Sequence, residues 1–118
     1  MSISFFQFEI WTVDLNPKKG HTQAWVRPCV IIQSDIFNKN SFETLVVVPL
    51  TSNILKKIFP CEFIIEPSNI NWLSNKSRYL WTQTITIDKK YLYKKLWTLE
   101  NKYKTNILNS IKILFNID

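Results

Sequence analysis

Two stretches that follow each other closely decide the fold: Glu9–Gly20, EIWTVDLNPKKG, and Arg27–Ile32, RPCVII. The first alternates well enough for a β-strand and then enters turn chemistry from Asn16 onward, which indicates a strand followed by a basic turn. The second contains an apolar run that is typical of a strand buried on both faces. Arg27 stands where this second strand begins, and its guanidinium offers a rigid fork of donors suited to phosphate oxygens. The two stretches therefore predict neighbouring strands with a candidate phosphate-binding arginine beside the turn.

The rest of the chain indicates further short strands and one longer helix. We predict strands over residues 7–15, 29–33, 44–48, 61–66 and 79–87, with polar loops over 35–41 and 68–77. Pro49 cannot donate to a ladder and should end the third strand. Asp88 can cap a short helical turn over 89–93, and apolar residues at three- and four-residue spacing predict a helix after Thr98 that runs to about Phe115. Short connections favour a small, strongly curved antiparallel sheet or barrel with a C-terminal helix, in one domain over residues 1–118.

Composition narrows the class of protein. The chain has 118 residues, of which 46% are hydrophobic, and this suits one domain with a real core. A formal net charge of +6 together with 14% aromatic residues indicates a polyanionic partner, either nucleic acid or an acidic protein segment, although a solubilising surface would also explain it. No apolar run reaches the roughly 18 residues of a membrane span, and the first residues lack the basic region of a secretory signal. We therefore expect a soluble cytoplasmic protein.

Several kinds of chemistry are disfavoured. Cys29 and Cys61 lie far apart in apolar stretches and should be buried free thiols rather than a zinc site or a disulfide. There is no phosphate loop or glycine-rich nucleotide motif, so neither a metal nor a cofactor is expected. His21 is the single histidine, which argues against a Ser-His-Asp triad. Gly20 is the single glycine, so Asn is expected where a positive φ is needed.

Arg27 is the first candidate for chemistry, although it could also extend to solvent or pair with Asp14 or Glu9. Thr51 and Ser52 directly follow a buried strand. Their hydroxyls could contact a phosphate or, more commonly, cap the turn that follows.

A second group of candidates would contact a polyanion through amide, aromatic and basic side chains. Thr82 and Gln83 lie on the last predicted strand, where the Gln83 amide could read a base edge. Trp25 precedes Arg27 by two residues and could stack an unpaired base, or could instead pack on the core or on a partner. The basic turn and the loop after it add the remaining candidates, which are Lys18, Lys19 and His21.

Three blocks in register carry a resemblance to a known family. They read VDLNPKKG-HTQAWV-RPCVIIQSD over 13–35, LVVVPLTSN over 45–53 and TQTITIDKKYL over 82–92. Their order and spacing across nearly the whole chain resemble the MazF/PemK/Kid family of toxin ribonucleases from toxin–antitoxin pairs.

The resemblance implies a small SH3-like curved antiparallel sheet with a C-terminal helix, working as a homodimer. It implies sequence-specific, metal-independent cleavage of single-stranded RNA, in which the RNA 2′-hydroxyl attacks its own phosphate. Arg27 and Thr51 would be the catalytic residues, Arg27 stabilising or protonating the phosphate region and Thr51 hydrogen-bonding a phosphate oxygen. The implied partner is an antitoxin whose disordered acidic and apolar tail folds onto the toxin.

The chain also departs from the family pattern. The family glutamate, glycine, acidic residue and arginine are replaced here by Thr22, Trp25, Thr82 and Ile85, whereas Gln83 is kept. His21 is a conceivable replacement base. Two alternatives therefore stay open: a toxin-fold protein with weakened catalysis that binds RNA or an antitoxin-like partner, and a gyrase-directed toxin of the CcdB type.

Overall fold

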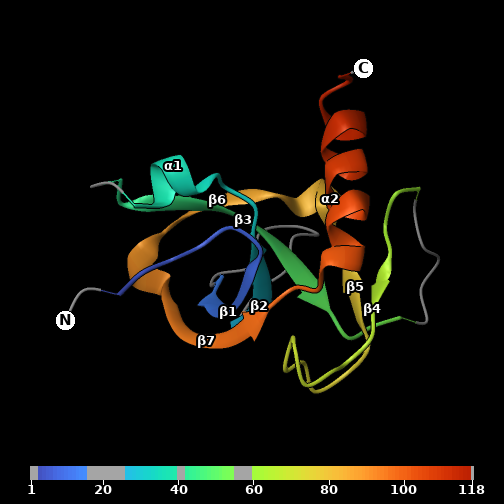
Figure 1. Cartoon of the computed structure of the whole chain (residues 1–118), viewed down its shortest axis with the longest axis horizontal. Helices are drawn as coiled ribbons and strands as arrows, with labels where there is room; N and C mark the ends of the chain where they lie inside the picture. The colour runs from blue at the N-terminus through green and yellow to red at the C-terminus, as the bar shows by residue number, and fades with distance from the viewer. Residues whose placement is uncertain (1–2, 16–25, 40–41, 55–59, 118) are drawn as a thin grey trace.

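A computed structural model describes residues 3–15, 26–39, 42–54 and 60–117. Figure 1 shows a curled sheet with the C-terminal helix standing along one side of it. In chain order the elements are β1 (Glu9–Asp14), β2 (Val26–Ile31), α1 (Asp35–Asn38), β3 (Thr44–Thr51), β4 (Ile64–Ile65), β5 (Ser77–Tyr79), η1 (Trp81–Gln83), β6 (Ile85–Asp88), η2 (Lys89–Tyr91), β7 (Leu92–Thr98) and α2 (Asn101–Leu114). The predicted curved antiparallel sheet with a C-terminal helix is confirmed.

Strand β3 is the centre of the sheet. Within the described residues seven strands pair in the order β4-β5-β3-β2-β1-β7, and β6 also pairs with β3. One edge of β3 pairs with β2, whereas the other edge pairs first with β6 and then with β5. The β-branched run from Thr44 suits this central position, because such side chains pack well on a pleated surface.

The prediction that Pro49 ends the third strand is wrong, because β3 continues to Thr51. β6 pairs with β3 as far as Val47, and β5 pairs with it from Leu50. Pro49 lies between these two partners, at a point where that edge needs no N–H donor. Its carbonyl still accepts a hydrogen bond from the Leu80 amide at 3.1 Å.

The predicted strand over 79–87 is also wrong, because it is two short strands separated by η1. Both strands lie along the same edge of β3. Val47 and Leu50 are three positions apart on β3, whereas their partners Ile85 and Tyr79 are six positions apart. The extra residues are taken up in the 3₁₀ turn, where the Thr84 hydroxyl donates to the Trp81 carbonyl at 2.6 Å.

Strand β7 was not predicted, because the sequence indicates a helical turn over 89–93 and no element over 94–97. The predicted helical turn is present only as the shorter 3₁₀ turn η2, and the Asp88 side chain makes no capping hydrogen bond to it. β7 pairs with β1 through two register shifts, so its apolar residues do not alternate regularly. A strand with such bulges lacks the period of two that sequence reading depends on.

The remaining predicted boundaries are corrected as follows. Of the strand over 61–66, β4 keeps Ile64–Ile65, because Cys61 has a φ of 68° and lies outside the β region. The loop over 35–41 contains α1, whose N-cap Ser34 accepts a hydrogen bond from the Ile36 amide. The second strand begins at Val26, which places Arg27 inside it.

Helix α2 packs one stripe on the sheet and ends in a defined cap. Tyr103, Ile107 and Ser110 are its buried residues, at the spacing of a single helix face. After the helix, Asn116 has a φ of 55°, and the amide of Ile117 donates to the Lys112 carbonyl at 2.7 Å. This is a Schellman cap in which Asn takes the place of glycine. The expectation that Asn supplies the positive φ is wrong at the other described non-glycine residues with a positive φ, which are Phe8, Cys61 and Trp72.

Two apolar clusters lie on opposite faces of the sheet. Successive residues of β1 to β3 alternate between them, since side chains of a strand point to opposite faces. The first, packed against α2, contains Ile10, Val30, Val48, Leu50, Ile65, Leu73, Tyr79, Leu99, Tyr103 and Ile107. The second contains Phe5, Trp11, Val13, Cys29, Ile31, Leu45, Val47 and Leu92. No described helix is long and apolar enough to cross a membrane.

The two cysteines differ in burial. Both are free thiols; Cys29 is fully buried in the second cluster, and Cys61 is half-buried. Burial raises the pKa of the Cys29 thiol far above its usual range, and the nearby Arg27 charge lowers it less.

We expect a thiol reagent at pH 8 to label Cys61 in the folded protein at least about 100-fold faster than Cys29, because the thiolate is the reacting form. Mass spectrometry of the labelled peptides measures both rates in one sample. Equal rates in urea provide the control, and equal rates in the folded protein would contradict this placement of Cys29.

Candidate active site

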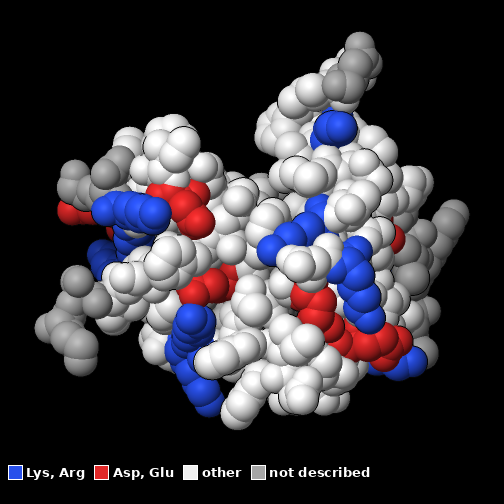
Figure 2. All heavy atoms as spheres, in the orientation of Figure 1, with Lys and Arg blue, Asp and Glu red and all other residues white. Residues whose placement is uncertain are grey.

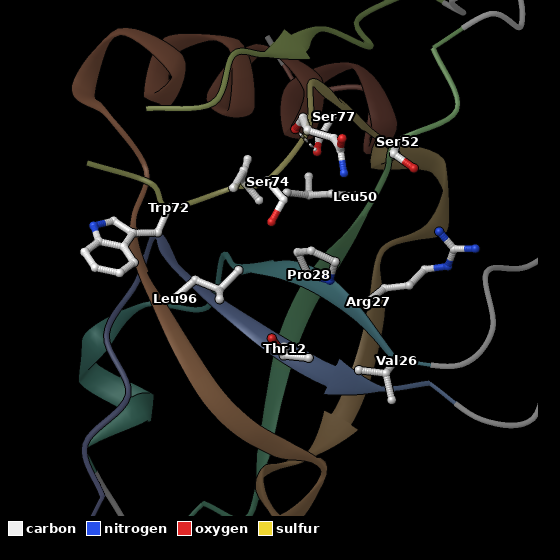
Figure 3. A pocket seen from close by; sticks show the side chains of 12 residues that line it. Thr12, Val26, Arg27, Pro28, Leu50, Ser52, Trp72, Ser74, Ser77 and Leu96 are labelled. Atoms are coloured by element: carbon white, nitrogen blue, oxygen red, sulfur yellow. Dashed lines mark hydrogen bonds between the residues drawn. The ribbon is translucent and has the colours of Figure 1, made fainter. Parts of the chain in front are cut away.

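A cavity of about 350 Å³ lies beside the predicted arginine. It is formed where β2 begins and β3 ends, with contributions from β1, β7 and the connection between β4 and β5. Figure 3 shows Arg27 and Trp72 on opposite sides of it. The lining residues are Thr12, Val26, Arg27, Pro28, Leu50, Ser52, Trp72, Leu73, Ser74, Asn75, Ser77 and Leu96.

The β2–β3 pairing brings three predicted site residues to one end of two strands. The β2–β3 register ends at Cys29↔Pro49, so Arg27 on β2 and Thr51 on β3 each lie two residues beyond its last pair. Ser52 follows directly and lines the cavity with Arg27. Figure 3 shows the Arg27 guanidinium and the Ser52 hydroxyl directed to the same end of the cavity. Residues that lie far apart in sequence therefore line the same cavity.

Thr51 has a structural contact of its own. Its side chain is buried, and its Oγ1 accepts a hydrogen bond from the Asn53 amide at 3.2 Å. Thr51 does not line the cavity, whereas Ser52 does. Capping of the following turn, one of the two roles expected for this hydroxyl, is thus present in the structure. Of the two hydroxyls, that of Ser52 has the more direct access to a ligand in the cavity.

Glu9 is paired with Lys95. The buried Glu9 carboxylate receives hydrogen bonds from the Phe6 amide at 2.9 Å and the Trp11 indole at 3.0 Å. Its second oxygen lies 2.7 Å from Lys95 Nζ. These three donors satisfy a charge that would be costly to bury alone.

A buried clamp shapes the loop on the far side of the cavity. The Asn71 side chain is fully buried; its amide donates to the Glu66 carbonyl at 2.8 Å and to Glu100 Oε1 at 2.9 Å. Its oxygen accepts from the amides of Ser68 and Leu73 at 3.1 and 3.0 Å. Glu100 also accepts from the Ser68 hydroxyl at 3.2 Å. Since Glu100 is the N-cap of α2, the clamp ties the cavity loop to the helix.

Sequence reading missed this side of the cavity. Trp72, Ser74, Asn75 and Ser77 line it, but the segment was predicted only as a polar loop. The Ser77 hydroxyl donates to the Asn75 carbonyl at 3.0 Å. The cluster of Ser and Asn over 74–77 was the available signal, because small hydroxyl and amide side chains commonly position polar ligands.

The other predicted site residues do not line the cavity or lie outside the described part. Thr82 and Gln83 belong to η1, which packs against α2 and β3. Thr82 is exposed and Gln83 is half-buried. Lys18, Lys19, His21, Thr22 and Trp25 lie outside the described residues. Among the residues that are described, no group of three or more His, Cys, Asp or Glu side chains could hold a metal ion.

The face shown in Figure 2 carries basic and acidic side chains side by side. The net charge of +6 is thus not gathered there into one continuous basic surface. Local placement of cations therefore matters more for ligand binding on this face than net charge does.

Removing the clamp should destabilise the protein and loosen the cavity loop. We expect Asn71→Ala to lower the free energy of unfolding by about 1–3 kcal/mol, because buried partners lose their hydrogen bonds. The exposed Asn69 of the same loop is the matched control, and Asn69→Ala should change it by less than about 0.5 kcal/mol. Urea unfolding followed by circular dichroism measures both, and equal effects would contradict the clamp.

Comparison with known proteins identifies the family and agrees with the fold. Residues 6–115 match the family described as PemK-like, MazF-like toxin of type II toxin-antitoxin system. The chain is 37% identical over 105 residues to endoribonuclease MazF of Staphylococcus saprophyticus, covering 89% of this chain and 86% of that protein.

Two solved structures share the fold. MazF of Deinococcus radiodurans superimposes with a TM-score of 0.80 at 16% identity, over 98% of this chain and 99% of that one. A mycobacterial endoribonuclease in complex with its cognate antitoxin gives a TM-score of 0.75 at 16% identity, over 98% and 96% of the two chains. The sequence, the curled sheet and the family match over nearly its full length agree: this chain belongs to the PemK-like, MazF-like toxins of type II toxin–antitoxin systems.

Proposed function

We propose that this chain is an endoribonuclease that cleaves single-stranded RNA and that a cognate antitoxin neutralises it in the cytoplasm. The observation that carries the proposal is the cavity lined both by Arg27, near the start of β2, and by Ser52, directly after β3. Membership of the toxin family and 37% identity to an endoribonuclease support it. The weakened-toxin and gyrase-directed alternatives have no comparable support in these findings.

The proposed reaction uses the substrate's own nucleophile. The RNA 2′-oxygen loses its proton and attacks the adjacent phosphorus, and the bond from phosphorus to the 5′-oxygen breaks. The 5′-oxygen takes up a proton, which leaves a 2′,3′-cyclic phosphate and a free 5′-hydroxyl. Negative charge grows on the non-bridging oxygens, where the Arg27 guanidinium would bind them or protonate the phosphate region.

The hydroxyls at the end of β3 would supply further hydrogen bonds to the same phosphate. Thr51 stays the predicted second catalytic residue, and Ser52, which lines the cavity, is a substrate-binding residue. We retain the other predicted RNA contacts, which are Lys18, Lys19, His21, Trp25, Thr82 and Gln83. Sequence specificity would come from contacts of this kind to base edges, since phosphate contacts read no sequence.

The proposed antitoxin carries a disordered tail rich in acidic and apolar residues. Such a tail would cover the cationic cavity and exclude RNA from it. A mycobacterial endoribonuclease of this fold has been solved with its cognate antitoxin, which supports a partner of this kind.

We also propose that the active form is a homodimer. The core-facing stripe of α2 continues past Ser110 to Leu114, which is 37% exposed, and the neighbouring Phe115 is 63% exposed. Figure 1 shows the C-terminal end of α2 extending beyond the sheet. An apolar helix face that extends beyond the sheet it packs on favours burial against a second copy of the chain.

Arg27→Ala should lower the rate of RNA cleavage by about 10²–10³-fold, the usual cost of removing one donor to a developing oxyanion. Arg27→Lys should stay well below wild type, because an ammonium lacks the fork of donors. Lys112→Ala, on α2 away from the cavity, is the matched control. A varied pool of single-stranded RNA, incubated with EDTA and mapped for new 5′ ends, gives the rates. An intact pool with wild-type protein, or full activity of Arg27→Ala, would overturn the proposal.

Leu114→Asp and Phe115→Asp should shift the protein from dimer to monomer, because each places a charge in the proposed apolar interface. Light scattering should give wild type twice the 14.1 kDa mass of one chain. Asn109→Asp adds the same charge at an exposed polar position of α2 and should leave the dimer intact. A monomeric wild-type protein at working concentration would refute the homodimer.

A further inference from the structure

A second cavity continues the first one away from Arg27. It has a volume of about 460 Å³ and is lined by Trp72, Ser74, Lys94, Lys95, Leu96 and Trp97. Trp72, Ser74 and Leu96 also line the Arg27 cavity, so the two form one continuous groove. A single-stranded RNA whose phosphate is bound at Arg27 can therefore extend along this groove past Trp72 to Trp97.

Two tryptophan rings stand exposed together in this groove. Trp72 is 63% and Trp97 is 50% exposed, and their ring centroids lie 6.3 Å apart at an interplanar angle of 33°. Tryptophan is buried on average, so two neighbouring exposed rings indicate a surface that contacts a ligand or partner. Figure 3 shows the Trp72 ring at the edge of the Arg27 cavity, directed away from the protein core.

The backbone at Trp72 strengthens this argument. Its φ is 59°, a left-handed conformation that glycine adopts readily and that is unfavourable for a bulky side chain. The Asn71 clamp described above holds the loop in this conformation, and the Trp72 amide donates to the Ser68 carbonyl at 2.9 Å. A loop that needed only to turn would be more stable with Gly or Asn here. Phe8 also has a positive φ, but its side chain packs against the core, whereas the Trp72 indole is exposed in a groove. Strain and exposure together therefore point to a role for the indole outside the core.

The second tryptophan is held by different contacts and has a cation beside it. Trp97 lies on β7 opposite Ile10 of β1. Lys95 Nζ lies 5.5 Å from the Trp97 ring centroid, and its ion pair with Glu9 anchors it. Lys94, also exposed, lines the same cavity. Aromatic faces interleaved with lysines match a single-stranded nucleic acid, whose bases stack while its phosphates meet cations.

We infer that Trp72 and Trp97 form a stacking platform for unpaired RNA bases that flank the phosphodiester bound at Arg27. This inference rests on the proposed RNA cleavage. Because every base has a π-face, the platform would raise affinity without selecting a sequence. It contacts the substrate away from the reacting atoms, so it should contribute to KM more than to kcat. Two adjacent exposed indole rings favour RNA over an acidic peptide as its ligand, because unpaired bases stack on such rings.

Trp72→Gly is the decisive variant, because it removes the indole and relieves the backbone strain at once. Loss of binding then cannot be attributed to an unfolded loop. We expect Trp72→Gly and Trp97→Ala each to weaken binding of a 2′-O-methylated, uncleavable RNA by roughly 5- to 150-fold. Trp72→Phe should recover most of the affinity. Phe42→Ala removes a ring that is 51% exposed outside both cavities and should bind as wild type does.

Cleavage kinetics separate this inference from the function on which it rests. With a long RNA the tryptophan variants should raise KM and keep kcat. With an RNA that is too short to reach the platform, the tryptophan variants should have the same KM and kcat as the wild-type protein. Wild-type cleavage that depends on Arg27, together with unchanged KM and RNA affinity in both tryptophan variants, would overturn the platform alone. Weaker binding of an acidic peptide with unchanged RNA binding would assign the surface to a protein partner and also overturn it. A wild-type protein that neither binds nor cleaves RNA would overturn both proposals.

Discussion

The change of partner along one edge of β3 is the constraint on which the rest of the structure depends. This strand pairs with β2 on one side, and with β6 and then β5 on the other. The passage from β6 to β5 occurs around Pro49, a residue that cannot donate to a ladder. The 3₁₀ turn η1 absorbs the mismatch in length between the two partners. One eight-residue strand thereby contributes to both apolar clusters and extends to the cavity.

The same change of pairing partner along β3 also positions the candidate site residues. Because β3 runs past Pro49, its end lies near the start of antiparallel β2, and Ser52, directly after β3, lines the same cavity as Arg27. Had the strand stopped at Val48, the hydroxyls would belong to a loop with no fixed relation to the guanidinium. On the other side of the cavity, Glu100 links the start of α2 to Asn71. Core packing and cavity geometry are thus coupled through the helix, and preorganised donors of this kind can act without rearranging during a reaction.

Local patterns predicted the parts of the fold that depend on local physics. The β-branched run of β3, the buried run of β2 and the apolar stripe of α2 each carry their own period and were found. The missed or misread elements depend on distant partners. β7 is irregular because of bulges against β1, and the division between β5 and β6 follows from the registers of both with β3. The site divides in the same way. A charged residue at a strand start identified Arg27, whereas Asn71, an ordinary residue of a polar loop, acquires its role through Glu100, which is 29 positions away.

Trp72 shows how a local rule that fails can itself be informative. A tryptophan in a polar loop is most simply read as a core or interface residue, and a left-handed backbone is most simply assigned to Gly or Asn. Here the core reading and the backbone rule both fail at one position, since the side chain is exposed and φ is 59°. Phe8, whose side chain packs against the core, and Cys61 also have a positive φ, so exposure of the indole is what sets Trp72 apart from them. Sites where local preference and observed structure disagree are commonly functional, because a cost in stability is retained only where something else depends on it. The physical basis for a ligand at Trp72 is therefore the combination of strain, exposure and a neighbouring tryptophan, and none of these alone would suffice.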